Sequence, residues 1–327
     1  MRECCNSVWI AGEGSAPALG TISITRTLNP HYSGFIKACV AAGCNGHCGT
    51  QSLHRSGQTP PLVFILLAPC QQRKIFPMII VITGASGAIG AALAQILHTR
   101  GDALLLCGRD ATKLEALNVA MDGAHQTLIA DLATADGVAL LQTKAAEVGV
   151  IDGLAHCVGS TVVRPLHLTS EKDWHDQIST NATSAFHVLK WFVVQATKAQ
   201  QPAVAVMTSS VVAEAGFANH EAIAAAKCAV TGLAMSAAAT YADKGVRVNV
   251  VAPGLTRSNL TRRFIATPEA EARSAALIPT NRIAEPVEVA HAFAYLLSRH
   301  AGHVTGQVIR VDGGQGVLRP LPRVVKP

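Results

Sequence analysis

A glycine-rich segment, Thr83–Gly90 (TGASGAIG), follows a short apolar run and leads into a stretch of helical character. Glycines permit a tight turn and let backbone N–H groups approach a phosphate, whose negative charge the start of a helix stabilises. The segment therefore predicts a site for the pyrophosphate of a dinucleotide. It is not a P-loop, because no Gly-Lys-Ser/Thr follows. It also comes within one residue of the G-x-S-x-G elbow of serine hydrolases, with Ser86 as nucleophile, and this remote alternative stays open.

Seven short runs rich in valine, isoleucine and leucine lie between Met78 and the C-terminus, and longer helical segments separate most of them. The runs are Ile79–Ile82, Ala103–Cys107, Gln126–Ala130, Ile151–Cys157, Ala203–Thr208, Val246–Ala252 and Gln307–Val311, and helical segments include Ala91–Arg100, Asn181–Ala199 and Ala222–Ala242. Strands that are apolar throughout are buried on both faces, and their alternation with helices is typical of a parallel sheet. We therefore predict one α/β domain with a doubly wound parallel (Rossmann) sheet, whose ligand site lies beyond the carboxyl ends of the strands.

The order and spacing of several motifs resemble the short-chain dehydrogenase/reductase family over residues 78–317. Thr83–Gly90 resembles the family's T-G-x-x-x-G-x-G cofactor loop, with Ala88 in place of the middle glycine. The segment His156–Gly159 stands where the family has N-N-A-G and keeps only the glycine. Further matches are Asp131-Leu132, Pro253-Gly254 and Asp312-Gly313-Gly314. The resemblance implies hydride transfer between a nicotinamide cofactor and a carbonyl or alcohol carbon.

The same resemblance implies roles for individual residues. Ser210 corresponds to the serine that polarises the carbonyl, Asn181 to the asparagine that holds a proton-relay water, and Lys227 to the lysine of Y-x-x-x-K, which also binds the nicotinamide ribose. The residues implied to bind the cofactor are Gly84, Ser86, Ile89, Gly90, Arg109, Asp131, Leu132, Gly159, Lys227, Pro253 and Gly254. No metal takes part in this chemistry.

The family's proton donor is a tyrosine four residues before the lysine, and here that position is Ile223. Isoleucine has no proton to donate. Ser210 stands thirteen residues before Ile223, as the family spacing requires, so the alignment is in register. Tyr241 lies eighteen residues further along the same expected helix and is too far away to replace the missing group. The sequence therefore predicts a divergent member of the family.

Three explanations for the missing tyrosine stay open. In the first, His220 donates the proton, because it precedes Ile223 by three residues and an imidazole pKa of about 6.5 suits proton transfer near neutrality. In the second, a water held by Asn181, Ser210 and Lys227 donates it, which makes a slow reductase. In the third, the chain binds the dinucleotide without turnover and serves as a sensor or an inactive partner subunit.

The end of the second apolar run bears on the choice of cofactor. An acidic side chain at Gly108 would bind the ribose 2′-hydroxyl of NAD and repel the 2′-phosphate of NADP, but glycine stands there. Arg109 follows and offers a planar set of donors to a phosphate. We therefore predict NADP, with NAD as the alternative. In the competing interpretation Arg109 only meets solvent, or Asp110 folds back and neutralises it.

Residues 1–77 show no sustained periodicity and contain six of the nine cysteines. We expect an extension without a fold of its own, arising from an early start codon, or an organelle-targeting segment, since it is poor in acidic residues. A metal site at Cys39, Cys44, His47 and Cys48 is a third interpretation that lacks a second pair of ligands. Residues 78–319 then form the Rossmann-fold domain that resembles the short-chain dehydrogenase/reductase family, and residues 320–327 form a C-terminal tail.

Charge and hydropathy limit the partners. Six basic and two acidic residues before Met78 account for four of the six net positive charges, so the domain itself is near neutral and no nucleic-acid partner is expected. No apolar run reaches the roughly 18 residues of a membrane-spanning helix, so we expect no membrane partner. We predict a small carbonyl or alcohol substrate, a homodimer or homotetramer, and a cytoplasmic protein, or an organellar one if the extension is a transit segment. The arginines of residues 255–282 either attract an anionic substrate or lie on a solvated face.

Overall fold

The computed structural model describes residues 77–319 of the 327-residue chain. The predictions for the first 76 residues, including the alternative metal ligands and the targeting role, lie outside the described residues. The prediction for the tail at residues 320–327 lies outside them as well.

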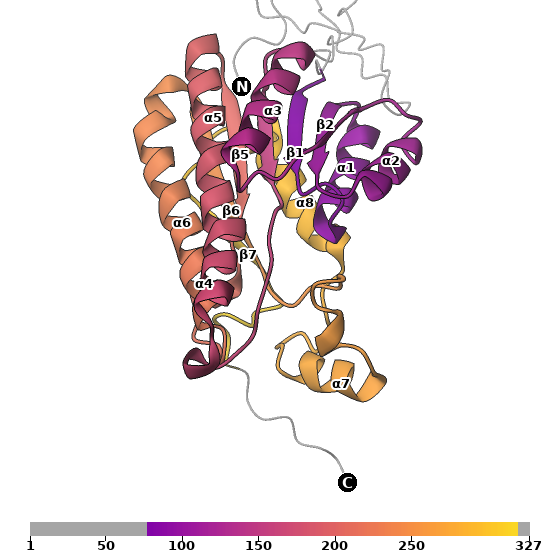
Figure 1. Cartoon of the computed structure of the whole chain (residues 1–327), viewed down its shortest axis with the longest axis vertical. Coiled ribbons are helices and arrows are strands. Elements are labelled where there is room, and N and C mark those ends of the chain that lie inside the picture. The colour runs from indigo at the N-terminus through magenta and orange to yellow at the C-terminus, as the bar shows by residue number, and fades with distance from the viewer. Residues whose placement is uncertain (1–76, 320–327) are drawn as a thin grey trace, which may run out of the picture. The chain divides into compact units, whose positions relative to one another are not determined.

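The seven expected strands are all present, with small shifts at their ends. They are β1 (Ile79–Thr83), β2 (Ala103–Gly108), β3 (Gln126–Ile129), β4 (Gly153–His156), β5 (Ala203–Thr208), β6 (Val246–Pro253) and β7 (Val308–Val311). They form one sheet in the order β3-β2-β1-β4-β5-β6-β7, and every neighbouring pair is parallel (Figure 1). The prediction of a doubly wound parallel sheet is therefore confirmed.

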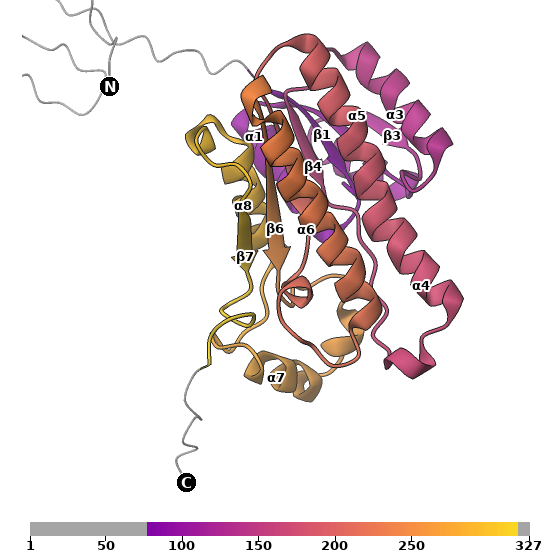
Figure 2. The same ribbon diagram turned by 90° about the vertical axis from the view of Figure 1, so that its left-hand side faces the viewer.

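The helices lie on both faces of this sheet. They are α1 (Ala88–Arg100), α2 (Ala111–Val119), α3 (Ala135–Val148), α4 (Glu171–Gln177), α5 (Ser184–Ala199), α6 (Glu221–Tyr241), α7 (Pro268–Ala276) and α8 (Pro286–Leu297). Figure 2 shows α5 and α6 side by side in front of the sheet, with α1 and α8 behind it. Successive side chains of a strand point to opposite faces, so the apolar strands supply both layers.

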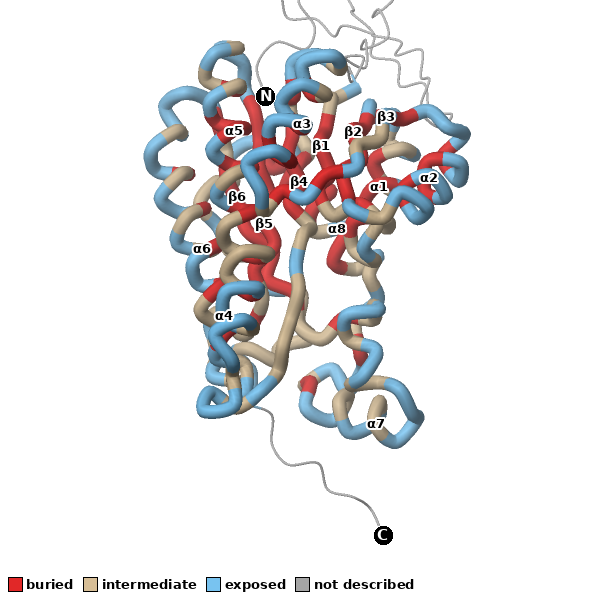
Figure 3. The backbone as a smooth tube through the Cα atoms, viewed as in Figure 1, coloured by how far each residue is buried: buried red, intermediate tan, exposed pale blue. Residues whose placement is uncertain are grey.

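Two apolar cores result from this alternation. In β1, Val81 faces a core shared with α3, α5 and α6, whereas Ile80 and Ile82 face a core shared with α1, α2 and α8. Figure 3 shows the strands buried between helices whose outer sides are exposed. Each helix therefore needs only one apolar side, which is why the expected helices contain many alanines and polar residues.

The expected helices differ from the observed ones mainly where they begin. α1 begins at Ala88, three residues before the expected start, so the glycine loop passes into the helix without a spacer. The expected helix Asn181–Ala199 begins as α5 at Ser184, and Asn181 lies in a π-helical turn, Ile178–Thr183, that joins α4 to α5. A single π-helical turn is too short for the spacing of apolar residues to distinguish it from an α-helical turn.

One helical stretch within residues 77–319, Glu221–Lys244, is long and apolar enough to span a membrane. It comprises α6 and the 3₁₀ turn after it, and α6 packs against β5, β6 and α5. Its apolar residues, such as Val230 and Ala234, lie in the core beside α5. The length and composition of this helix are therefore explained by its packing on the sheet.

The core beneath α8 should govern stability. Phe293 is fully buried, and we expect Phe293→Ala to lower the free energy of unfolding by about 3–5 kcal/mol, because it removes a large buried ring and leaves a cavity. Tyr295→Ala on the same helix is the control, since Tyr295 is half exposed, and its cost should stay near 0.5 kcal/mol. Urea unfolding measures both, and equal losses would contradict this assignment of the core.

Candidate active site

A cleft of about 1970 Å³ lies beyond the carboxyl ends of the strands. Its walls come from the segments that follow strands β1 to β6, as expected for a doubly wound sheet. Strand β1 pairs with β2 on one side and β4 on the other, so the order of strands reverses between β1 and β4. The predicted cofactor residues all line this cleft: Gly84, Ser86, Ile89, Gly90, Arg109, Asp131, Leu132, Gly159, Lys227, Pro253 and Gly254.

The loop after β1 depends on two glycines. Gly84 has φ +72°, and a Cβ there would lie 2.7 Å from the carbonyl carbon of Cys157 and 2.8 Å from the nitrogen of Val158. A Cβ at Gly90 would lie 2.4 Å from the oxygen of Gly84. No other amino acid fits at either position, so the loop closes tightly against β4 and against the first turn of α1.

The start of α1 faces the cleft with free backbone donors. Its N-cap is Gly87, which provides no capping side chain, and no acidic residue lies in the first turn. The first N–H groups of a helix have no partner within the helix, and the helix dipole favours an anion there. The loop and this helix start are therefore suited to an anion such as a pyrophosphate.

Ser86 belongs to the same loop and lies beside the end of β2. Its hydroxyl would be 2.9 Å from a Cβ placed on Gly108. Within residues 77–319, no hydrogen bond joins Ser86 to a histidine. A hydrolytic serine needs such a base, so the arrangement gives the hydrolase alternative no support.

Arg109 and Asp110 follow β2 and take different positions. Asp110 caps α2, accepting a hydrogen bond from the backbone of Lys113, and its carboxylate also lies 2.7 Å from the Lys113 ammonium. These contacts lower the pKa of Asp110. Asp110 therefore does not neutralise Arg109, whose guanidinium lies 3.8 Å from Asp131 and is two-thirds exposed. Arg109 thus lines the cleft in a long, exposed ion pair with Asp131.

Asp131 and Leu132 follow β3 on the same side of the cleft as Arg109. Asp131 accepts a hydrogen bond from the backbone of Ala133, which fixes the turn into α3. Leu132 is buried in the core beneath it. The pair thus presents one polar and one apolar side chain to the cleft, a surface suited to the edge and face of a planar base.

Asn181 and Lys227 converge on Gly159, which follows β4. A Cβ on Gly159 would lie 3.4 Å from the Asn181 Oδ1 atom and 3.4 Å from the Lys227 Nζ atom. The glycine therefore leaves room for two polar side chains from α6 and the π-helical turn. Asn181 is fully buried and does not itself line the cleft, whereas its neighbours Gly159 and Ser160 do.

Two residues that the sequence analysis missed hold Asn181. Its Nδ2 donates to the Gln177 carbonyl (2.9 Å) and to the Ser160 hydroxyl (3.2 Å), and its Oδ1 accepts from the Ser160 backbone N–H (3.2 Å). Asn181 is therefore not a helix cap. The one signal in the sequence was spacing, because Gln177 precedes Asn181 by four residues; nothing local marks Ser160.

Lys227 is buried in α6 beneath the cleft. Its Nζ donates to the Thr208 carbonyl at 2.9 Å, and burial lowers its pKa to about 8. An ammonium with this pKa is still mostly charged at pH 7. Burial also raises the pKa of the neighbouring Cys157 thiol to about 12, so Cys157 supplies no counter-charge. Lys227 is thus a largely uncompensated cation at the cleft.

Ser210 lines the cleft at the end of β5, close to the end of β6. Its hydroxyl accepts from the backbone of Val212 at 3.3 Å and lies 3.5 Å from the Pro253 carbonyl. A Cβ on Gly254 would lie 2.9 Å from Asp312, so the turn after β6 packs closely on the C-terminal loop. Ser210 therefore lines the cleft between the ends of β5 and β6.

Ile223 and His220 occupy the first turn of α6. Ile223 is 4% exposed and lines the cleft on the same helix as Lys227, so an apolar side chain stands where the resemblance expects a phenol. His220 is the N-cap residue of α6 and also lines the cleft, and its Nδ1 lies 2.7 Å from the Ala218 carbonyl. Among the described residues of the cleft wall, His220 is the one histidine.

His156, the last residue of β4, is fully buried under the site. Its Nδ1 lies 2.8 Å from the Thr83 hydroxyl and its Nε2 lies 3.3 Å from the Ser184 hydroxyl, which donates to the Thr180 carbonyl. These bonds suit a neutral ring that donates from Nε2. Burial, with a smaller effect of Lys227, lowers the pKa of His156 to about 3. His156 is therefore a neutral link between β1 and α5.

The segment between β6 and α8 covers the outer side of the cleft. Of its arginines, Arg257 pairs with Glu271 and Glu285, and Arg263 lies over the ring of Phe264. Arg257 is thus not free for an anionic substrate. Within residues 77–319, no group of three or more histidine, cysteine, aspartate or glutamate side chains could hold a metal ion.

A parallel sheet of this order, with a glycine loop and a helix start at its switch point, defines a dinucleotide-binding protein of the Rossmann class. A family model described as Enoyl-(Acyl carrier protein) reductase matches residues 84–315. The chain is 36% identical over 238 residues to cis-4-hydroxycyclohexanecarboxylate dehydrogenase of Sinomonas cyclohexanicum. The alignment covers 72% of this chain and 94% of that protein.

Two solved structures are similar over most of their length. A short-chain type dehydrogenase/reductase from Mycobacterium ulcerans has a TM-score of 0.70 and 28% identity, covering 74% of this chain and 90% of that one. A gluconate 5-dehydrogenase from Burkholderia cenocepacia, in complex with NADP and tartrate, has a TM-score of 0.70 and 26% identity. The match covers 74% of this chain and 96% of that one. The chain belongs to the short-chain dehydrogenase/reductase family of oxidoreductases.

His156 should make the fold sensitive to acid. Its pKa is about 3 in the folded chain and 6.5 ordinarily, so between these values the unfolded chain binds more protons and stability falls as the pH falls. The slope should reach about 1.4 kcal/mol per pH unit from this residue. We expect His156→Asn to remove that share, measured by urea unfolding between pH 7.5 and 4.5. The exposed His303→Asn is the control, and an unchanged slope in His156→Asn would refute the assignment.

Proposed function

We propose that this chain is an NADP(H)-dependent oxidoreductase that transfers hydride between nicotinamide and a carbonyl or alcohol carbon. The observation that carries the proposal is the convergence of Asn181 and Lys227 on Gly159, at the cleft that the glycine loop opens. A diphosphate site alone would fit any dinucleotide-binding protein. A buried cation in the same cleft as the Ser210 hydroxyl is what a developing oxyanion requires.

The cofactor fits the residues of the cleft. Gly84 leaves the space that a Cβ would fill, and the free N–H groups of α1 suit a pyrophosphate. Lys227 would hold the nicotinamide ribose, while Asp131 and Leu132 would border the adenine. When bound, the cofactor supplies or accepts the hydride; the protein residues orient the substrate and manage its charge and proton.

The protein's part in catalysis centres on Ser210, Lys227 and His220. Ser210 would donate a hydrogen bond to the substrate oxygen, and the Lys227 cation would stabilise the negative charge that grows there. Asn181, clamped by Ser160 and Gln177, would hold a water between itself and Lys227. His220 would supply the proton, because it shares the cleft wall with Ile223 and its Nδ1 contact leaves Nε2 free to exchange protons.

A second candidate is a binder without turnover. It is favoured by Ile223, since a buried isoleucine excludes water from the place where the family's phenol acts. In that case Lys227 would serve cofactor binding alone. The two candidates make the same prediction for NADPH affinity and opposite predictions for turnover.

The substrate is proposed to be a small molecule with apolar surface. The cleft wall includes Leu260, Phe264, Leu277 and Phe217, and the ring of Phe217 contacts that of His220. The dehydrogenase of Sinomonas cyclohexanicum is named for a ring alcohol that also carries a carboxylate. Because α5 and α6 pack together and expose Phe186 and Met235, a homodimer or homotetramer through these helices is also proposed.

Arg109 should select NADPH. We expect Arg109→Ala to weaken NADPH binding roughly tenfold or more and to change NADH binding less than twofold, because only NADPH carries the 2′-phosphate. Titration followed by nicotinamide fluorescence measures both, with Arg299→Ala as the control on an exposed arginine away from the cleft. Equal losses for the two cofactors would contradict the selectivity, and no binding of either at millimolar concentration would refute the proposed function.

His220 and Ile223 should control proton supply. We expect His220→Asn to lower the kcat for reduction of ketones and quinones by NADPH about 100-fold, the usual effect of losing a general acid. Adding Ile223→Tyr to that variant should restore turnover, since a phenol would again stand beside Lys227. If His220→Asn keeps its turnover, water is the donor; if no variant turns over while NADPH binds, the chain is a binder.

A further inference from the structure

The segment between β6 and α8 is a closed loop with a short neck. Thr256 and Ala284 form a parallel β-bridge, the Arg257 N–H donates to the Ala284 carbonyl (2.9 Å), and the Ala284 N–H donates to the Leu255 carbonyl (3.1 Å). Residues 258–283, here called the cover segment, leave and return through this neck. Helix α7 lies in the middle of the cover segment, away from the sheet in both views (Figures 1 and 2).

Helix α7 shapes the cleft although it has no apolar anchor within its own residues. None of its residues is buried. Ser274 on α7 and Leu277 just after it line the cleft, and Ser274 donates to the Phe264 carbonyl at 2.9 Å within the same segment.

Burial of apolar surface is what normally holds a helix in place. The C-terminal end of α7 is anchored by Ile278, which is buried two residues beyond α7, and by the Thr280 N–H, which donates to the Gly313 carbonyl at 3.3 Å. The rest of the helix has no such anchor, so its orientation depends on polar contacts.

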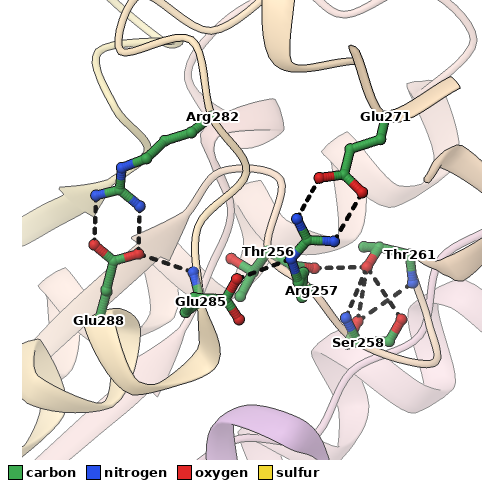
Figure 4. A network of polar contacts seen from close by, with 8 residues as sticks. All are labelled: Thr256, Arg257, Ser258, Thr261, Glu271, Arg282, Glu285 and Glu288. Atoms are coloured by element: carbon green, nitrogen blue, oxygen red, sulfur yellow. Dashed lines mark hydrogen bonds and ion pairs between the residues drawn. The ribbon is translucent and has the colours of Figure 1, made fainter. Parts of the chain in front are cut away.

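Arg257 makes those contacts from the neck. Its Nη1 and Nη2 atoms bind the two carboxylate oxygens of Glu271 on α7, with Nη1 at 3.0 Å, and its Nε donates to Glu285 at the start of α8 at 2.8 Å (Figure 4). The guanidinium also lowers the pKa of Glu271. A paired arginine–carboxylate fork sets both distance and orientation, so this side chain links α7 directly to the start of α8 and restrains its orientation.

A second fork nearby provides a natural comparison. Arg282 binds both oxygens of Glu288, at 2.7 and 2.5 Å, and Glu288 accepts from the Glu285 N–H (Figure 4). This fork joins the end of the cover segment to α8 and does not touch α7. The two ion pairs thus have the same chemistry but different places, and the Arg282 side chain (59%) is more exposed than that of Arg257 (38%).

We infer that Arg257 is a positioning residue, which seats α7 over the cleft through Glu271 and so sets the wall that meets the substrate. The inference rests on the proposed function, because it assigns the cover a role in substrate binding. The side chains of Arg257 and Glu271 are 38% and 37% exposed, so water and salt weaken the pair. The position of α7 over the cleft should accordingly depend on ionic strength.

Trypsin can test directly whether α7 is held in place, because Arg262, Arg263, Arg273 and Arg282 lie in the cover segment. We expect Glu271→Gln to speed cleavage at these sites roughly tenfold at low salt, since one charge-assisted fork is lost from a partly exposed site. Added salt should speed cleavage of the natural chain and leave the variant almost unchanged. Glu271 lies on a helix without buried residues, so the fold itself should remain intact, as circular dichroism would verify.

Two control variants separate positioning from general loosening. Glu269→Gln removes the same charge from the same helix, and Glu288→Gln breaks the comparison fork while keeping every trypsin site. Both should be cleaved at the natural rate. If either is cleaved as fast as Glu271→Gln, or if Glu271→Gln is cleaved at the natural rate, Arg257 does not seat α7.

Kinetics test the link to the substrate. The assay uses NADPH and whichever of the tested ketones and quinones is turned over fastest. Glu271→Gln should raise KM for that substrate about fivefold and change kcat less than twofold, because a loosened cleft wall weakens substrate binding. Arg257→Lys should resemble Glu271→Gln, since an ammonium cannot hold both carboxylates in one plane. An unchanged KM would overturn the role in binding. The protease assay needs no cofactor. Cleavage of Glu271→Gln at the natural rate would therefore count only against the positioning of α7 by Arg257, whereas absence of NADPH binding would count against the proposed function.

Discussion

The site depends on the contact between the loop after β1 and the end of β4, where Gly84 leaves no room for a side chain. Because the two backbones touch, the start of α1 and the residues after β4 face the same cleft. The cradle for a dinucleotide and the place of Gly159 follow from that contact. Gly159 in turn makes room for Asn181 and Lys227, which come from segments some 20 and 70 residues further along the chain.

The charges of the site are arranged around one buried cation. Lys227 donates to a backbone carbonyl and has no carboxylate within its described contacts, so its charge is directed at whatever enters the cleft. The neighbouring groups stay neutral, since burial keeps Cys157 protonated and His156 unprotonated near pH 7. A low local dielectric strengthens the attraction of such a cation for an oxyanion. Ile223 adds apolar surface to this environment at the place where the family has an acid.

The cover of the cleft is held by different forces from the rest of the domain. The sheet and its helices pack through two apolar cores, whereas α7 has no buried residue and is joined to the body by Arg257. Apolar packing is little affected by salt of physiological concentration, and partly exposed ion pairs are weakened by it. One domain thus combines a sheet packed through apolar cores with a helix whose own side-chain contact with the body is an ion pair.

The sequence by itself determined the seven strands, their parallel arrangement and the cofactor loop, because continuous apolar runs and glycine spacing are local properties that require a buried sheet and a tight turn. Through the resemblance it also predicted site residues, all of which line the cleft except Asn181, which lies buried behind Gly159 and Ser160. Only the tertiary structure revealed the clamp of Ser160 and Gln177 on Asn181, the capping role of Asp110 and the two carboxylates held by Arg257. These contacts join residues whose separation in space depends on how the helices pack. The spacing of residues along the chain does not determine that separation.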